Sequence, residues 1–263
     1  MYKKALLSIV VTTYICCIST AFASAPQSVF TPEQEARIGE IAADYLVSHP
    51  EILVKVSQKL QEQQQARQQL GFAMKVLENQ QALLNDKDTP MSGPSDARVA
   101  VIQFFDYQCV YCSKLAPEME KVMKARGDVR YIFKEWPIFA SRWENSQKAA
   151  EKGLAVWKTA GADAYVRYHN GVYQTGHFEG ELTVSDIDKA AADALTGHKT
   201  PLVNDDAAAI LQKTGNLAQA LGLTGTPGLI VMPVNKATPD KITVLPGAVP
   251  AEQIIAAIDK ASR

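Results

Sequence analysis

The sequence predicts an α/β domain with an inserted helical subdomain, preceded by a helical region suited to oligomerisation. From about residue 95 onward, apolar runs typical of strands alternate with helix-like segments in the order strand, helix, strand, helical block, strand, strand, helix. A helical block placed inside such a frame indicates a subdomain and not a second sequential domain. Before this region, residues 31–84 are rich in Gln, Glu, Ala and Leu and contain a single proline inside the helical pattern.

Residues 1–25 have the features of an export signal. Two lysines precede an apolar run over residues 5–18, and small residues offer cleavage after Ala23 or Ala25. A membrane anchor is disfavoured because the run is short and interrupted by polar residues. Removing the segment takes away two of four cysteines and lowers Lys plus Arg from 27 to 25 against 28 acidic residues, a formal charge near −3. We therefore predict a periplasmic protein with two cysteines and no partner nucleic acid.

The predicted oligomerisation region, residues 26–89, contains side chains spaced alternately three and four apart, as in a coiled-coil seam. The seam positions are Leu53, Val56, Leu60, Gln63, Arg67, Leu70, Met74, Leu77, Gln81 and Leu84. His49-Pro50 predicts a break between a shorter helix and this long one. An apolar stripe of this length needs a partner, either the following domain or copies of the chain. We predict self-association, with a helical arm that does not oligomerise as the alternative.

The sequence Cys109-Val110-Tyr111-Cys112 follows an apolar run and precedes a helix-like run. Residues three apart on a helical turn are neighbours, so the two sulfurs can close a small disulfide ring. Unpaired N–H groups at the helix N-terminus stabilise the thiolate of the first cysteine. This arrangement predicts Cys109 as the nucleophile and Cys112 as the resolving thiol.

Two other interpretations of this motif are disfavoured. Structural zinc needs four protein ligands, and His169, His177 and His198 are scattered along the chain. A purely structural bridge across so small a ring would constrain little of the unfolded chain. We therefore predict no bound metal and no separate cofactor, only a redox-active disulfide between Cys109 and Cys112.

The main domain is predicted to span residues 90–263, with its helical insertion over about 139–222. The strands are expected at 99–105, 128–136, 228–232 and 242–245, and the closing helix at 250–261. A capping-box pattern at 141–144 predicts the start of a helix in the insertion, and 204–213 and 217–221 predict further helical pieces. A polar stretch with Pro and Gly at 85–94 predicts a linker.

Thr224-Gly225-Thr226-Pro227 stands directly before a predicted strand. An X-Pro bond at a tight turn is a candidate for the cis form. Proline cannot donate to a strand ladder, so we expect it at a sheet edge left open for an extended peptide. An ordinary turn proline is the alternative, but the C-x-x-C on the preceding half of the domain favours the functional interpretation.

Three segments, 104–112, 133–138 and 224–227, resemble the DsbA-like branch of the thioredoxin superfamily, over about residues 95–261. The helical N-terminal region is similar to that of the suppressor-of-copper-sensitivity C, Com1-like and bovine colonisation factor H-like subgroup. The resemblance implies a thioredoxin fold with an inserted helical subdomain and favours a homotrimer.

The resemblance also implies a function. It implies a periplasmic disulfide isomerase with some thiol oxidase activity, acting on unfolded or misoxidised exported proteins and served by a membrane redox partner. Thr226 and Pro227 are then expected to hold the client backbone, together with Val110 and Tyr111. The alternatives are a monomeric thiol oxidase, a Cu(I)-binding or holdase envelope protein, and a scaffold that uses only the helical region.

One position departs from the pattern of the family. Thioredoxin-like domains usually carry a buried acid six residues before the first cysteine, where this chain has Gln103. An amide forms hydrogen bonds but cannot accept a proton at neutral pH. We expect resolution by Cys112 to be slow, unless Glu135 or water takes over this role.

Overall fold

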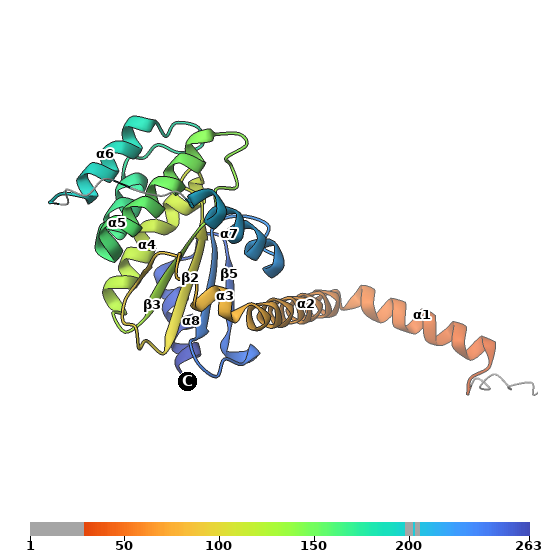
Figure 1. Cartoon of the computed structure of the whole chain (residues 1–263). Coiled ribbons are helices and arrows are strands. Elements are labelled where there is room, and N and C mark those ends of the chain that lie inside the picture. The colour runs from red at the N-terminus through yellow and green to blue at the C-terminus, as the bar shows by residue number, and fades with distance from the viewer. Residues whose placement is uncertain (1–28, 198–201, 203–205) are drawn as a thin grey trace, which may run out of the picture. The chain divides into compact units, whose positions relative to one another are not determined.

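The computed structural model describes residues 29–197, 202 and 206–263 (Figure 1). The predicted export signal, residues 1–25, and His198 lie outside the described residues. The chain divides into two compact units, with the boundary between Lys59 and Leu60. In the part of the chain that is described, no helix is both long and apolar enough to cross a membrane.

The first unit contains α1 (Pro32–Ser48) and the start of α2 (Glu51–Glu78), which continues into the second unit. Thr31 caps α1, because its hydroxyl accepts from the backbone N–H of Gln34 at 3.3 Å while the Gln34 side chain accepts from the Thr31 N–H at 2.9 Å. The two helices meet at His49-Pro50, where the sequence predicts a break. No residue of α1 is buried.

The second unit is built on a five-stranded sheet of order β1-β3-β2-β4-β5. Its strands are β1 (Met91–Ser92), β2 (Val99–Phe105), β3 (Arg130–Glu135), β4 (Gly228–Pro233) and β5 (Thr243–Pro246). Strands β2 and β3 are parallel, and the other pairs are antiparallel. The expectation of Pro227 at a sheet edge is wrong, because it precedes β4, which pairs on both sides.

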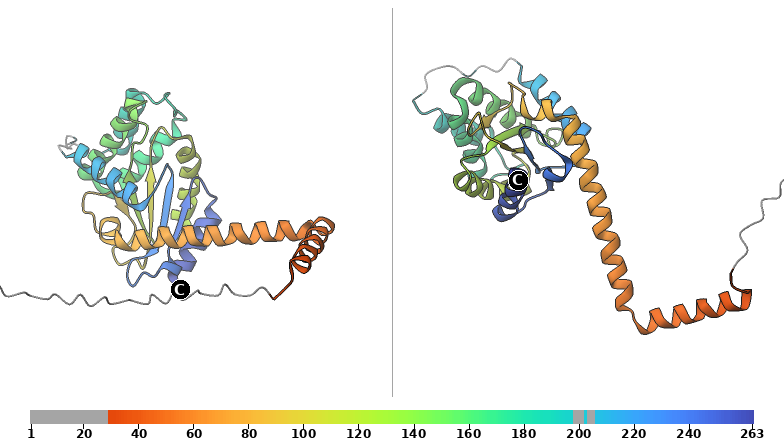
Figure 2. Two further views of the ribbon diagram at one scale, coloured as in Figure 1. Left: turned by 90° about the vertical axis from the view of Figure 1, so that its right-hand side faces the viewer. Right: turned by 90° about the horizontal axis from the view of Figure 1, so that it is seen from below.

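Helices cover both faces of this sheet (Figure 2). Alternate residues of β2 point to opposite faces, so Val101 and Phe105 enter one core while Ile102 and Phe104 enter the other. The first core is shared with α4 (Val110–Ala125), α5 (Glu144–Gln174), α6 (Val184–Ala194) and α8 (Ala251–Ser262). The second is shared with the end of α2, α3 (Gln80–Leu84) and α7 (Ala207–Leu221).

The helical insertion lies between β3 and β4 and comprises α5, α6 and α7. One local prediction for it is wrong. The cap of α5 is Trp143, which makes no side-chain capping hydrogen bond, so the pattern at 141–144 is not a capping box. The pieces expected at 204–213 and 217–221 are helical where the structure describes them, and they form one helix, α7, that continues through Gly215-Asn216; residues 204 and 205 lie outside the described residues.

The C-terminal part of α2 belongs to the core of the second unit. Its buried residues are Ala73 and Val76, which lie beside the predicted seam, whereas the seam residues Leu70 and Met74 are exposed. The compact unit thus begins at Leu60, earlier than the domain boundary expected at residue 90. The core helices α2 and α3 supply the apolar cover for one sheet face, which explains the difference.

The stretch predicted as a linker, residues 85–94, is tied to the sheet. It contains β1, which pairs with β3, and Asp86, whose carboxylate accepts from the ammonium of Lys134 at 3.0 Å and from that of Lys213 at 2.8 Å. Lys134 also donates to the hydroxyl of Thr89 at 2.7 Å. A buried lysine needs such partners, so this cluster fixes the end of α3 against β3.

Candidate active site

The candidate dithiol lies where β2 passes into α4. Cys109 is the N-cap residue of α4, with an extended backbone, and Cys112 stands in the first turn of the helix. Asp106 shapes the connection, because its carboxylate accepts from the N–H of Gln108 at 2.8 Å, the N–H of Phe139 at 2.9 Å and the hydroxyl of Ser146 at 2.7 Å. Three donors on one buried carboxylate hold the loop in a single conformation.

The two thiols meet the Thr226-Pro227 loop. The Sγ of Cys109 lies 3.3 Å from the carbonyl oxygen of Thr226, and the Thr226-Pro227 bond is cis. Both cysteines are free thiols in the structure, with Cys109 4% and Cys112 0% exposed. The fold therefore brings together four of the predicted site residues, from segments more than a hundred residues apart in the chain.

The two thiols differ in acidity. The pKa of Cys109 falls to about 6, chiefly because the Cys112 thiol donates to its sulfur, with further help from Thr226 and the helix N–H groups of Cys112 and Tyr111. Burial raises the pKa of Cys112 well above its ordinary value, and the adjacent Cys109 raises it further. One sulfur is thus a thiolate at neutral pH and the other a protonated, buried partner.

The remaining predicted site residues lie next to Cys109. Tyr111 is 57% exposed, and the ammonium of Lys114 lies 5.1 Å from the centroid of its ring. Val110 is partly buried. Gln108 binds the loop after α5, because its carbonyl accepts from the N–H of Glu179 at 3.0 Å and its side-chain oxygen accepts from the N–H of Gly180 at 2.8 Å. That loop borders the dithiol from the insertion side.

A buried polar cluster lies under the dithiol, on the same sheet face. The carboxylate of Glu135 accepts from the hydroxyls of Tyr107 at 3.0 Å and Tyr165 at 2.7 Å, and burial raises its pKa well above the ordinary value. Gln103 is also buried, and neither of its amide atoms has a hydrogen-bond partner among the described residues. The hydroxyl of Tyr173 donates to the carbonyl of Asp106 at 3.0 Å.

Sequence reasoning missed Asp106 and these tyrosines. Asp106 carries a local signal, since an Asp that accepts from the N–H two residues later forms a common turn. Tyr165 and Tyr173 lie on α5, far along the chain, and nothing local to the cysteines points to them.

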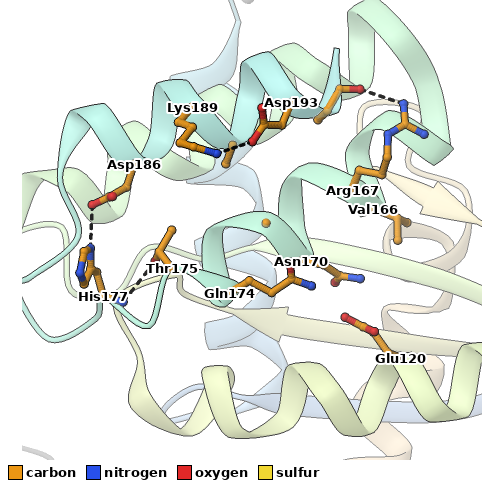
Figure 3. A pocket seen from close by; sticks show the side chains of 13 residues that line it. Glu120, Val166, Arg167, Asn170, Gln174, Thr175, His177, Asp186, Lys189 and Asp193 are labelled. Atoms are coloured by element: carbon orange, nitrogen blue, oxygen red, sulfur yellow. Dashed lines mark hydrogen bonds and ion pairs between the residues drawn. The ribbon is translucent and has the colours of Figure 1, made fainter. Parts of the chain in front are cut away.

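A separate cavity of about 640 Å³ is bordered by α5, α6 and Glu120 of α4 (Figure 3). Charged groups on its walls are paired with one another, His177 with Asp186 at 3.0 Å and Lys189 with Asp193 at 2.7 Å. None of the predicted site residues lines this cavity.

Two family models match the chain. The one described as Thioredoxin matches residues 85–243, and the one described as Copper resistance protein ScsC N-terminal domain matches residues 34–67. An acidic first thiol, a buried second thiol and a cis-proline loop within contact distance define the class of thiol–disulfide oxidoreductases. The chain belongs to the thioredoxin family, in the subgroup of ScsC and BcfH.

Solved structures agree with this assignment. The chain is 38% identical to BcfH of Salmonella enterica Typhimurium, covering 88% of this chain and 97% of that one, with a TM-score of 0.71. It is 30% identical to Proteus mirabilis ScsC in a transitional conformation, covering 89% and 99%, with a TM-score of 0.59. It is 27% identical to a periplasmic thioredoxin-like protein from Salmonella enterica serovar Typhimurium, covering 70% and 95%, with a TM-score of 0.57.

Among curated proteins, the chain is 26% identical to Disulfide bond formation protein D of Bacillus subtilis over 159 residues, 55% of this chain and 68% of that protein. It is 25% identical over 130 residues, 47% of this chain, to the Na(+)/H(+) antiporter NhaA 3 of Salinispora tropica. The chain spans about a fifth of the length of the two antiporters that it matches.

Proposed function

We propose that this protein is a periplasmic disulfide isomerase with some thiol oxidase activity, acting through Cys109 and Cys112 on unfolded or misoxidised exported proteins. The observation that carries the proposal is the asymmetry of the dithiol. The pKa of Cys109 is lowered to about 6, whereas burial raises that of Cys112. Such a pair can attack a disulfide with one sulfur and hold the second thiol in reserve.

The reaction follows from this asymmetry. The Cys109 thiolate attacks one sulfur of a client disulfide, forms a mixed disulfide and releases the other client sulfur as a thiolate. In isomerisation, a client thiolate then attacks the mixed disulfide and expels Cys109 unchanged. If no client thiolate arrives, Cys112 attacks the Cys109 sulfur, releases the client thiol and closes the Cys109–Cys112 disulfide. In oxidation, that disulfide passes to a reduced client by the reverse steps.

The client backbone is proposed to lie along Thr226 and Pro227, with Val110 and Tyr111 beside it. This is supported by the contact of 3.3 Å between the Cys109 sulfur and the Thr226 carbonyl. It is also supported by the exposure of Tyr111, whose ring offers an apolar surface next to the reacting sulfur.

The first unit is proposed to assemble the protein into a homo-oligomer, with a trimer favoured. Support comes from the match of residues 34–67 to the ScsC N-terminal domain and from the apolar side chains that the unit leaves exposed. Several dithiols around one assembly would hold an unfolded client while its disulfides are exchanged. The predicted export signal and the likeness to a periplasmic protein support the compartment, where a membrane redox partner would reset the dithiol.

The test is refolding of a scrambled, disulfide-bonded substrate protein by the full chain and by a chain lacking residues 26–59. The deletion stops at Lys59 because the rest of α2 contributes to the core of the second unit. We expect the full chain to be oligomeric and to restore native disulfides, and the shortened chain to be monomeric and to lose most of this activity. Equal refolding by both chains would contradict the proposed need for the first unit, and refolding by neither chain would contradict the isomerase assignment and favour the thiol oxidase.

Copper binding is a second candidate, because the model that matches residues 34–67 is described as part of a copper resistance protein. Cys109 and Cys112 are soft ligands suited to Cu(I). Titration of the reduced protein with Cu(I), with Cys109→Ser and Cys112→Ser as controls, tests this. Tight binding lost in both variants supports a copper role, and weak binding in all three proteins contradicts it.

A further inference from the structure

A small cavity of about 260 Å³ adjoins the Thr226-Pro227 loop, within the second unit. Gln68, Gln69 and Phe72 of α2 form one wall, residues 222–228 form another, and the end of β5 with Gly247 forms the third. The cavity thus joins a helix outside the sheet to the loop that contacts the Cys109 sulfur.

The wall from α2 is held by a specific contact. The amide nitrogen of Gln69 donates to the carbonyl of Val244 at 3.1 Å, and its amide oxygen accepts from the Val244 N–H at 3.5 Å. Because β5 is an edge strand, these groups would otherwise be open to pairing. Gln69 therefore takes the place of a neighbouring strand and keeps Phe72 facing the loop.

The loop side of the cavity includes three glycines, Gly222, Gly225 and Gly228, which contribute only backbone to the lining. A Cβ added at Gly225 or at Gly247 would meet nothing within 4 Å, so there is open space over both residues. The N–H of Gly247 donates to the carbonyl of Pro227 at 2.8 Å, which fixes this part of the lining. The hydroxyl of Thr226 is buried and interacts with the two thiols. The open space over Gly225 and Gly247 lets a polypeptide approach this backbone closely.

We propose that this cavity is a subsite for one apolar side chain of the client, close in sequence to the cysteine that reacts, and that Phe72 is its recognition wall. The inference rests on the proposed function and adds to it a determinant of client choice. The occupant is a side chain, because the cavity is smaller than the roughly 300–1,000 Å³ of pockets for free ligands. Phe72, Leu223 and Val244 make the lining apolar, and unfolded clients expose apolar side chains.

Residues 68–72 of α2 lie between the two segments that match family models, 34–67 and 85–243. The wall is therefore supplied by the part of α2 that connects the N-terminal region to the domain, and client binding at the dithiol depends on that connection.

The test uses the full chain carrying Cys112→Ser and two symmetrical peptide disulfides, which differ only in Leu or Ser beside the cysteine. Cys109 attacks one peptide sulfur, the peptide disulfide breaks, and one peptide leaves as a thiolate. Each rate is divided by the rate with glutathione disulfide, which has no such side chain. We expect the Leu peptide to react about tenfold faster than the Ser peptide. This ratio corresponds to only part of the free energy gained when a leucine side chain is buried.

Two variants challenge the subsite independently. Phe72→Ala removes the wall, and we expect the preference for Leu to fall to about twofold, with Phe72→Leu restoring most of it. Gly225→Ala adds a methyl group into the open space, and we expect it to reduce the preference without loss of folding. The matched controls are Ile255→Ala, a partly buried apolar residue on α8, and Gly127→Ala, where an added Cβ also meets nothing within 4 Å.

The outcomes separate the two proposals. A preference for Leu that survives in both Phe72→Ala and Gly225→Ala, while glutathione disulfide still reacts, overturns the subsite and leaves the proposed function standing. An equal rate for the two peptides with the parent chain also overturns it. If Cys109 reacts with none of the three disulfides, the proposed function fails and the subsite fails with it.

Discussion

The two units of this protein contain amphipathic segments of similar kind but treat their apolar faces differently. In the second unit, every residue of β2 and β4 is buried between helices. In the first unit, α1 buries nothing, and Ile41 and Tyr45 remain 55% and 54% exposed. An apolar face without cover in its own chain needs cover from elsewhere. The comparison therefore supports the proposal that the packed unit carries the chemistry and that the exposed unit contacts other copies of the chain.

The most severe test of this division is Cys109→Ser. A serine hydroxyl is not ionised at neutral pH, so we expect disulfide exchange to fall by more than about a thousandfold. Oligomer mass and thermal unfolding should remain those of the parent chain, because the chemistry resides in the second unit. Cys112→Ser is the matched control and should accumulate a mixed disulfide with client. A change of oligomer mass in Cys109→Ser would contradict the division.

The pH dependence of the nucleophile should be the next largest effect. Since the pKa of Cys109 is lowered to about 6, the thiolate is lost as the pH falls through 6, and alkylation should slow roughly a hundredfold from pH 8 to pH 4. The folded pKa lies below that of an unfolded thiol, about 8.5, so the reduced protein gains stability as the pH rises between these values.

Iodoacetamide labelling followed by mass spectrometry gives the profile. Cys112→Ala removes the thiol that does most to lower the pKa of Cys109, so its midpoint should move upward. Deletion of residues 26–59 should leave the midpoint in place. A midpoint that moved with this deletion would show that the first unit shapes the thiolate.

The buried cluster around Asp86 tests how firmly the second unit is anchored to its N-terminal helices. Lys134→Met leaves the buried Asp86 with Lys213 as its remaining ion-pair partner, and we expect a loss of about 2 kcal/mol in the free energy of unfolding. Lys213 is largely exposed, so Lys213→Met should cost less than about 1 kcal/mol. Denaturant unfolding measures both. Equal losses would mean that burial of Lys134 does not decide the anchoring.

The exposed face of α1 gives a smaller but more selective effect. Charges placed at Ile41 and Tyr45, as Ile41→Asp with Tyr45→Asp, should dissociate the oligomer and lower refolding of scrambled substrate about tenfold. The reaction of Cys109 with glutathione disulfide should persist at the parent rate. Arg37→Asp with Glu40→Lys, which alters an exposed ion pair of the same helix, is the matched control. An unchanged oligomer mass in the double Asp variant would refute the assigned role of α1.

Much of this fold could be predicted from local pattern. The β2 strand is marked by a continuous apolar run and the α4 helix by a helical pattern, and the pair Cys109 and Cys112 is indicated by spacing alone. The boundary of the second unit could not be predicted in this way. Whether a stripe on α2 meets its own domain or a second copy depends on tertiary packing. Ala73 and Val76 contact the domain from beside the predicted seam, and the seam residues Leu77 and Leu84 pack in the same core.

The surroundings of the dithiol show the same limit. The cis Thr226-Pro227 bond follows from a local signal, but its place before an interior strand does not, because strand order is a property of the whole sheet. The sequence pointed to Glu135 as a residue near the site. It did not predict that its carboxylate accepts hydrogen bonds from two tyrosine hydroxyls, one of them from α5.

The smallest expected effect concerns Gln103, in the packed unit. Its amide faces the same core as the dithiol without a hydrogen-bond partner among the described residues, and it cannot take the proton of Cys112. Glu135 is a weak substitute, since its raised pKa favours the protonated form. We expect Gln103→Glu to speed resolution of the mixed disulfide severalfold, because a carboxylate can accept that proton.

Stopped-flow decay of a Cys109–peptide disulfide measures the rate of resolution. Gln103→Leu, which supplies no base, should give no increase in that rate. A rate unchanged by Gln103→Glu would mean that proton removal from Cys112 does not limit resolution, and that approach of the Cys112 sulfur to the mixed disulfide does.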